Sequence, residues 1–159
     1  MPASSGVSFK DSRAVLISIF VAAGTLLALV AIAMLLPPLL PVVLCAAGFV
    51  AARLYNGRST QPLSAAGGAR LGWMTGLWLF VVVAVLYAAA ALSLSSPQGW
   101  EQAKSMWAQL PQASKLLTLT QHEFFVQLLM ALPFFFFLLT LLPGLGGMIG
   151  AKLFRRRQS

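Results

Sequence analysis

Hydrophobic residues fill four long stretches of this chain, and polar or charged residues gather between them. The stretches are residues 14–36, 39–54, 71–92 and 124–151. An α-helix rises about 1.5 Å per residue, so about 20 apolar residues cross the roughly 30 Å hydrocarbon core of a bilayer. The second stretch is short for a crossing, and the fourth is longer than one crossing needs. The pattern predicts an all-α polytopic membrane protein with four transmembrane helices.

Residues that break helices or begin them mark the limits of these stretches. Pro37 and Pro38 end the first stretch, and Asn56-Gly57 signals a turn after the second. Ser64 is a suitable N-cap before the third. The resulting division is a disordered cytoplasmic lead at 1–13, a transmembrane domain at 14–151 with an external loop at 93–122, and a basic cytoplasmic tail at 152–159.

Two prolines interrupt the last stretch. Pro133 lies in mid-span and removes one backbone hydrogen bond, so it is expected to kink the helix. Pro143 is followed by Gly144, and we expect this pair to break the helix near its inner end. The glycine-rich segment after the break is then expected to lie at the cytoplasmic interface.

The loop at 93–122 carries a helical pattern of its own. Ser96 suits an N-cap, and Pro97 suits the first helical turn. Apolar residues then recur at helical spacing as far as Pro111, namely Trp100, Ala103, Trp107 and Leu110. The pattern predicts a short amphipathic helix on the outer face, with Trp100 and Trp107 at headgroup depth. Two roles stay open for it, sealing of the outer leaflet and binding of a partner or ligand.

Basic residues sort to one side of the four predicted helices. Nine of the eleven lysines and arginines fall in the N-terminal lead, at the end of the second helix or between it and the third, or in the C-terminal tail. Because basic residues collect in cytoplasmic loops, both termini are predicted to be cytoplasmic. The residues expected to anchor this surface are Arg53, Arg58, Arg70, Lys152, Arg155, Arg156 and Arg157.

Composition supports the membrane class and narrows the choice of partners. The chain has 159 residues, of which 59% are hydrophobic and 9% charged, and its mean hydropathy of +0.87 excludes an ordinary soluble domain. Its net charge is +8 and its pI is near 11.0. Basic residues at the ends of membrane helices set the orientation of the helices and attract anionic lipid headgroups. We therefore expect the lipid bilayer as a partner, and no nucleic acid.

Small residues recur every four positions on several predicted helices. Such faces let two helix backbones approach closely in a membrane, where the hydrophobic effect supplies no attraction between helices. Arg70 falls on the opposite side of its helix from the glycines, free to reach the headgroups. The residues expected to make helix-packing contacts are Ser64, Gly68, Gly72, Gly76, Gly146, Gly150, Ala47 and Ala51. They favour a tightly packed bundle, or one that also self-associates.

The glycines near the C-terminus do not form a nucleotide-binding loop. The dinucleotide fingerprint that would begin at Gly144 requires a glycine at the position of Ile149, and the phosphate loop requires a Gly-Lys pair, whereas Lys152 follows Ala151. The charge-free stretch before these glycines indicates a membrane helix. We interpret the segment as the inner end of that helix.

Groups that perform chemistry are scarce in the predicted spans. No ionisable residue lies between their flanks, which argues against ion-coupled transport. His122-Glu123 lacks the second histidine of a zinc motif, and the single Cys45 excludes an intramolecular disulfide. We predict no catalytic residue, metal or cofactor. The polar residues within the spans are each expected to make one interhelical hydrogen bond, and they are Ser18, Thr25, Cys45, Thr75, Tyr87, Gln127 and Thr140.

Two further patterns leave alternatives open. The N-terminal basic residues, the apolar run and Ala31-Ile32-Ala33 imitate a secretory signal, but the run is too long for one, so a retained first helix is favoured over a cleaved one. Residues 47–55 and 146–154 match in chemical type position by position. The match indicates either a parallel internal repeat or the similar residue types that two helix ends use where they leave the membrane.

Residues 68–76 (GARLGWMTG) and 146–152 (GGMIGAK) resemble uncharacterised small bacterial membrane proteins with four helices. Some of those proteins carry an added N-terminal zinc ribbon, whose cysteines this chain lacks. The resemblance covers the last two helices and their loop. It implies a location in the bacterial cytoplasmic (inner) membrane and brings no activity with it.

These features together predict a non-enzymatic integral membrane protein. The favoured role is that of a scaffold or accessory subunit that associates, with a second copy or with another membrane protein, through its glycine-rich helix faces. The alternative is a passive pore or permease component formed by oligomerisation.

Overall fold

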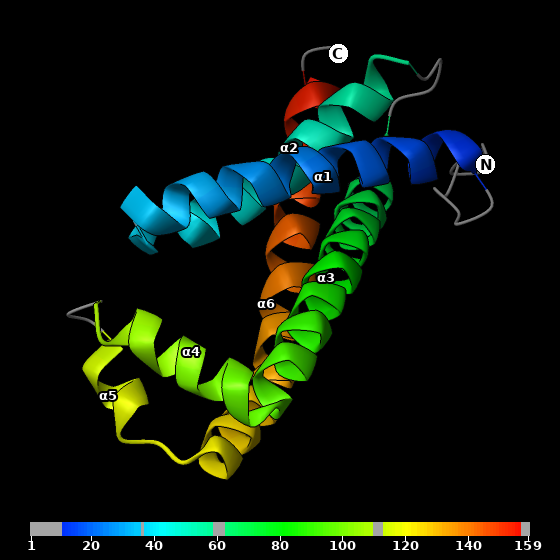
Figure 1. Ribbon diagram of the computed structural model, residues 1–159. Helices are drawn as coiled ribbons and strands as arrows, with labels where there is room; N and C mark the ends of the chain where they lie inside the picture. The colour runs from blue at the N-terminus through cyan, green and yellow to red at the C-terminus, as the bar shows by residue number, and fades with distance from the viewer. Residues whose placement is uncertain (1–10, 36, 59–62, 110–112, 157–159) are drawn as a thin grey trace. The chain divides into compact units, whose positions relative to one another are not determined.

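The computed structural model describes residues 11–35, 37–58, 63–109 and 113–156, and the structural statements below concern these residues. All the regular elements in this part of the chain are helices, as Figure 1 shows. They are α1 (Ser12–Leu35), η1 (Pro37–Leu39), α2 (Leu40–Asn56), α3 (Ala65–Ser95), α4 (Pro97–Trp107), α5 (Ser114–Leu117) and α6 (Gln121–Arg156). The predicted all-α class is confirmed.

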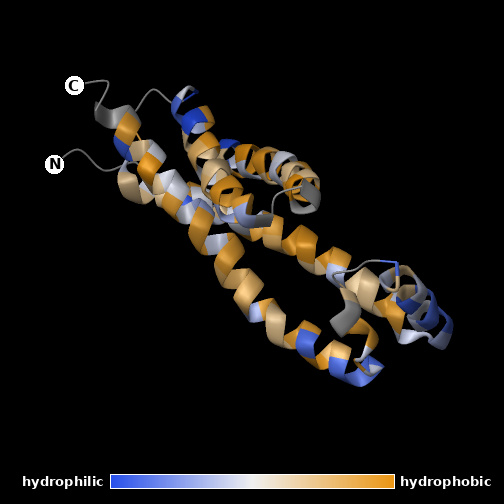
Figure 2. Cartoon of the chain, turned by 90° about the vertical axis from the view of Figure 1, so that its left-hand side faces the viewer, coloured by the Kyte–Doolittle hydropathy of each residue, from blue (hydrophilic) through white to orange (hydrophobic). Residues whose placement is uncertain are grey.

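Three of the described helices are long and apolar enough to cross a membrane, namely those over Ser12–Ile32, Ala65–Ser95 and Gln121–Leu153. The fourth apolar helix, α2, has 17 residues, a length of about 25 Å. Large apolar side chains stand exposed on the long helices, with Phe20 76% exposed and Met130 77%. Figure 2 shows hydrophobic residues along most of the length of these helices and hydrophilic ones gathered near their ends. Such surfaces fit contact with lipid.

The observed helix limits differ from those read from hydropathy. α3 begins at Ala65 rather than at 71, because the Ser64 hydroxyl caps it by accepting a hydrogen bond from the backbone N–H of Gly67 at 3.0 Å. Arg70 therefore lies within a helix. At the N-terminus, α1 already includes Ser12 and Arg13, and residues 1–10 of the expected disordered lead lie outside the described residues.

The expected break at Pro143 is wrong, because α6 runs without interruption from Gln121 to Arg156. A proline inside a helix removes one donor, here the one that would serve the carbonyl of Leu139. That carbonyl lies against Gly76 of α3, in the place a side chain would take. The carbonyl that lacks its helical donor thus packs against a neighbouring helix.

The chain divides into two compact units. The first comprises Met1–Val81 and Phe136–Ser159, and the second Val82–Phe135. In the first unit α1 lies beside α2 (Figure 1), and a buried cluster joins small and medium side chains of its helices. The cluster includes Ala14, Ile17, Val21, Ala47, Ala51, Ala52, Leu63, Leu71, Met74 and Ala151.

The second unit contains the predicted short helix, α4. Ser96 accepts a hydrogen bond from the backbone N–H of Gly99 at 3.0 Å, which confirms the expected N-cap. Trp100, 6% exposed, packs edge-on against Trp107 with ring centroids 5.6 Å apart, and both rings contact Phe124 of α6. Both tryptophans therefore face an aromatic cluster of their own chain. Leu110 and Pro111 lie outside the described residues.

The start of α6 in this second unit is also capped. The Glu123 carboxylate accepts from the backbone N–H and the hydroxyl of Thr120, both at 2.8 Å, and the N–H of Glu123 donates back to that hydroxyl at 3.3 Å. This reciprocal pair is a capping box. Gln121 donates to the carbonyls of Leu94 and Ser95, which ends α3 with satisfied acceptors.

Candidate functional site

The adjacent glycines Gly146 and Gly147 place α6 between two other helices of the first unit. The carbonyl of Cys45, on α2, occupies the space where a side chain at Gly146 would stand. The carbonyl of Gly68, on α3, does the same at Gly147. One residue of an α-helix is rotated by about 100° from the next, so two neighbouring glycines open two different faces. Both are needed because α6 approaches a helix backbone on each face.

The contact between α3 and α6 advances by four residues at a time on both helices. Side chains at Gly68, Gly72 and Gly76 would overlap backbone of Gly147, Pro143 and Leu139, in that order. Phe80 and Phe136 continue the series with ring centroids 5.0 Å apart. Positions rise on one helix as they fall on the other, so the two helices are antiparallel. Rows of residues spaced by four on one helix most commonly pack against similar rows on the other helix.

The contact between α2 and α6 has the opposite sense. Cys45 meets Gly146, and Phe49 and Ala52 meet Gly150, where a Cβ would stand 3.2 Å from the side chains of both. Positions rise together along the two helices, which are therefore parallel. In a chain that crosses a membrane four times, the second and fourth helices run in the same direction, as α2 and α6 do here.

The carbonyl oxygen of Pro143 is the point at which all three helices meet. It lies where a side chain at Gly48 of α2 would stand, and also where one at Gly72 of α3 would stand. Pro143 itself is fully buried. Dispersion contacts and weak Cα–H···O contacts hold such a crossing together, and they require backbones this close. We call these three residues, Gly48, Gly72 and Pro143, the triple crossing.

The structure distributes the expected packing residues over several contacts. Gly68, Gly72 and Gly76 face α6, and Gly146 and Gly150 face α2. Ala47 and Ala51 lie in the buried cluster that includes Ala14, Ile17 and Val21 of α1. Ser64 serves as the cap of α3.

Sequence reasoning missed three members of the site, Gly48, Gly147 and Pro143. A signal for two of them was present, because Gly48 and Ala52, like Gly147 and Ala151, are four residues apart. Each pair forms a second small-residue face beside the one that was recognised. The carbonyl of Pro143 left no signal in the residue pattern, since any residue supplies a carbonyl.

The expected interhelical hydrogen bonds are wrong for three buried threonines. Thr25, Thr75 and Thr140 donate to the carbonyls of Val21, Leu71 and Phe136 at 2.7, 3.0 and 2.7 Å, each four residues earlier on the same helix. A threonine hydroxyl in a helix reaches this carbonyl without help from a neighbour. Ser18 Oγ is buried with no hydrogen-bond partner among the described residues. These hydroxyls therefore form no polar path from helix to helix.

The helix ends that carry the basic residues lie together in the first unit. The buried cluster contains residues from the start of α1 (Ala14), the end of α2 (Ala52), the start of α3 (Leu71) and the end of α6 (Ala151). Four of the seven expected anchors, Arg53, Arg58, Arg70 and Lys152, are exposed. The side chains of Arg155, Arg156 and Arg157 lie outside the described residues.

Asp11 is the one carboxylate side chain of the first unit, and it joins two of these helix ends. It accepts a hydrogen bond from the Tyr55 hydroxyl of α2 at 2.7 Å and one from the backbone N–H of Arg13 at 3.0 Å. The Tyr55 hydrogen bond is the largest of the effects that hold the pKa of Asp11 below its ordinary value of 3.8; the backbone hydrogen bonds and the charge of Arg13 lower it further, against a smaller opposing effect of burial.

Removal of the Tyr55 hydroxyl should weaken this link. Tyr55→Phe is expected to lower the free energy of unfolding by about 1–2 kcal/mol at neutral pH, the size of a hydrogen bond to a charged group that is partly exposed. Because the pKa of Asp11 is depressed in the folded state, this contribution is present above pH 3.8 and is lost as the pH falls through the lower folded value.

Denaturant titrations of both proteins at pH 7 and at the lowest pH that keeps them folded measure this loss. The control is Tyr87→Phe, which keeps the ring contact of Tyr87 with Phe135. An equal loss of stability at both pH values for Tyr55→Phe, or the same loss in the control, contradicts the assignment.

Metal-binding groups do not gather in the described part of the chain, where no three His, Cys, Asp or Glu side chains lie close enough to hold an ion. Comparisons with protein-family models, with curated proteins and with solved structures find no match. The resemblance to small four-helix bacterial membrane proteins thus stays a prediction from the two quoted segments.

Proposed function

We propose that this chain is a non-enzymatic membrane protein of the bacterial inner membrane, with four crossings and both termini in the cytoplasm, that serves as a scaffold or accessory subunit. The observation that carries the proposal is the triple crossing, which fixes α2, α3 and α6 to one another through backbone contacts. Three helices packed this closely suit a structural role, because backbone contacts resist their sliding or rotating against one another.

The orientation is supported by where the helix ends lie. The exposed basic residues belong to helix ends that share one buried cluster, and basic residues favour the cytoplasmic side. The antiparallel α3–α6 contact and the parallel α2–α6 contact agree with four alternating crossings. α2 is slightly short for a crossing, but apolar exposed residues such as Val42 give it a surface suited to lipid.

Association with a partner needs a surface other than the glycine faces. The expected contacts at Gly68, Gly72, Gly76 and Gly146 are filled by helices of the same chain. We therefore place the partner surface on the exposed apolar side chains, among them Phe20 and Leu27 of α1. A pore within a single copy has less support, because the buried threonine hydroxyls bond within their own helices and give no hydrophilic lining.

Photo-crosslinking in cells tests the proposal. A photoreactive phenylalanine analogue at Phe20, which is 76% exposed, is expected to give a discrete adduct with a membrane protein. The matched control replaces Leu44, which is 1% exposed and should give none. The purified protein in liposomes is expected to pass no small solute, and a reporter fused after Ser159 is expected to lie in the cytoplasm.

Three results would contradict the proposal. They are solute flux through liposomes that contain the wild-type protein, a protein that stays monomeric and partnerless at every exposed position tested, and an external reporter signal. The first supports a pore, the second removes the accessory role, and the third inverts the topology.

A further inference from the structure

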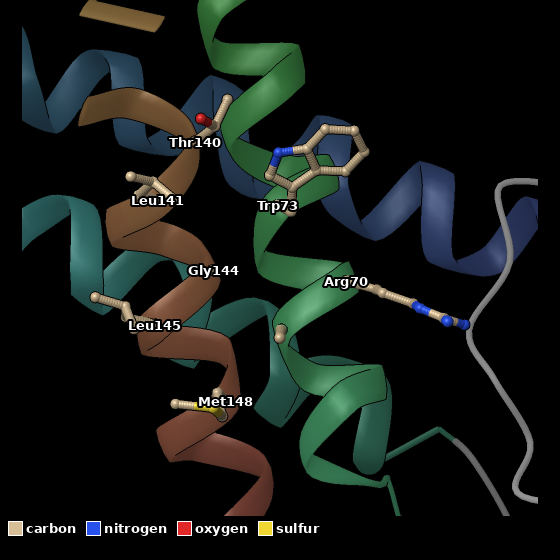
Figure 3. Close-up of a pocket in the computed structure, with 8 residues that line it drawn as sticks. Arg70, Trp73, Thr140, Leu141, Gly144, Leu145 and Met148 are labelled. Atoms are coloured by element: carbon tan, nitrogen blue, oxygen red, sulfur yellow. The ribbon is translucent and has the colours of Figure 1, made fainter. Parts of the chain in front are cut away.

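An apolar groove runs along the outer side of the contact between α3 and α6. Its volume is about 360 Å³, and Ala69, Arg70 and Trp73 of α3 form one wall. Leu141, Leu145 and Met148 of α6 line the other, as the close-up in Figure 3 shows. All of these residues belong to the first unit. Ligand pockets in proteins begin at about this size.

Two small residues, Ala69 of α3 and Gly144 of α6, keep the groove open. Gly144 lies on its α6 side, and a side chain added there would find only the carbonyl of Ala69, at 3.7 Å, as a neighbour. Gly144 therefore differs from the glycines of the triple crossing, where helix backbone fills the same space. A glycine with room beside it leaves a depression between the larger side chains on each side.

The charged residue of the groove lies toward one end of it. In the antiparallel register, Arg70 and Met148 lie toward the ends of α3 and α6 that carry basic residues, and Leu141 lies toward the middle of the helices. The hydroxyl of Thr140 is bonded to the carbonyl of Phe136 and offers little polarity to the groove. The groove is thus apolar along its length, and Arg70 stands at the end that we assign to the cytoplasmic surface.

Arg70 forms no ion pair with an acidic side chain of the described residues. The sequence contains three acidic side chains, and all are described. Asp11 is bonded to Tyr55, Glu101 forms an ion pair with Lys104, and Glu123 caps α6 with Thr120. Figure 3 shows the guanidinium of Arg70 extending outward from α3, away from the α6 side chains. Its charge lies beside the groove, on the α3 side.

We propose that this groove binds an anionic phospholipid, with one acyl chain between Trp73 and Leu141 and the phosphate at Arg70. The order of polarity along the groove matches that of the lipid, and the charge of Arg70 is complementary to the headgroup. A second copy of the chain in the same membrane orientation would bring a basic surface against Arg70. Repulsion between the like charges opposes that contact. The inference depends on the membrane location and not on the scaffold role.

Native mass spectrometry of the full-length protein tests this site, with phosphatidylglycerol and phosphatidylcholine as the two probes. We expect the first phosphatidylglycerol to bind about fivefold more tightly than phosphatidylcholine, the effect of one basic side chain near an anionic headgroup. Arg70→Gln should reduce that ratio to about one. Arg53→Gln is the matched control, because Arg53 is an exposed arginine near the same end of the molecule that does not line the groove.

Gly144→Leu tests the acyl chain separately by filling the groove. It should weaken the binding of the first phosphatidylglycerol while the far-ultraviolet circular dichroism spectrum stays that of the wild type. A second measurement uses phosphatidylglycerol with brominated chains, which quench nearby tryptophan. The part of the quenching that is lost in Trp73→Phe comes from lipid in the groove. Arg70→Gln should reduce this part of the quenching.

Several outcomes overturn the proposal. Equal affinity for the two lipids in the wild type means an unselective lipid shell, and equal losses in Arg70→Gln and Arg53→Gln mean a general surface charge. Unchanged binding in a folded Gly144→Leu variant means that no chain enters the groove. A change of oligomeric mass in that variant, without a change in lipid affinity, assigns the groove to a second copy.

Discussion

Gly72→Ala is expected to destabilise the protein by about 2–3 kcal/mol, the cost of forcing an extra group into a well-packed interior. The new methyl group would overlap the carbonyl of Pro143 and come within 3.1 Å of the Cα of Gly144. Both neighbours are backbone, so no side chain can rotate out of the way. Relief requires α3 and α6 to separate along the contact that begins at Gly68.

Two glycines with open surroundings serve as controls for this substitution. A side chain at Gly144 meets one atom at 3.7 Å, and one at Gly24 of α1 meets nothing within 4 Å. Gly144→Ala and Gly24→Ala should leave stability unchanged or raise it slightly, since alanine favours a helix by up to about 1 kcal/mol over glycine. Unfolding in mixed detergent micelles, followed by circular dichroism, compares all three. Equal stability of Gly72→Ala and Gly144→Ala means that α3 and α6 are not in contact at Gly72.

Gly146→Ala and Gly147→Ala are expected to separate different helices from α6, although the two residues are neighbours. A methyl group at Gly146 would overlap the backbone of Cys45 and move α2 away. One at Gly147 would overlap the carbonyl of Gly68 and move α3. Cys45 is the single cysteine and is half-buried, so its thiol reports on the first change alone.

Alkylation of Cys45 by an uncharged maleimide in detergent measures this difference. Gly146→Ala should raise the rate several-fold over the wild type, because the displaced helix exposes the thiol. Gly147→Ala should leave the rate close to that of the wild type under conditions where both variants are folded. A higher rate in Gly147→Ala than in Gly146→Ala would reverse the assignment of the two faces.

Hydropathy predicted the helical class and the three long apolar helices because both depend on composition over about 20 residues. It misplaced the start of α3, since residues 65–70 are small or charged and are helical through the Ser64 cap rather than through their apolar character. Hydropathy averaged over a window measures how well a segment suits lipid. It does not show where the backbone hydrogen bonds of a helix begin or end.

The candidate site was only half visible in the sequence. Spacing of four residues identified Gly68, Gly72, Gly76, Gly146 and Gly150, because that spacing places residues on one face whatever the partner is. The partner is a matter of tertiary structure. The sequence therefore did not predict which helix Gly147 contacts, or the Asp11–Tyr55 hydrogen bond, which joins residues 44 positions apart. The break expected at Pro143 failed for the same reason, because the carbonyl that lacks its helical donor packs against a neighbouring helix.

The triple crossing also sets an order in which the protein can be assembled. The first unit draws on both ends of the chain, Met1–Val81 and Phe136–Ser159. α2 and α3 are synthesised before α6, so Gly48 and Gly72 lack the Pro143 carbonyl that lies between them until α6 has been made. Packing of the first unit is therefore completed only after α6 has been synthesised, and a chain that stops before Pro143 leaves the contact faces of Gly48 and Gly72 uncovered.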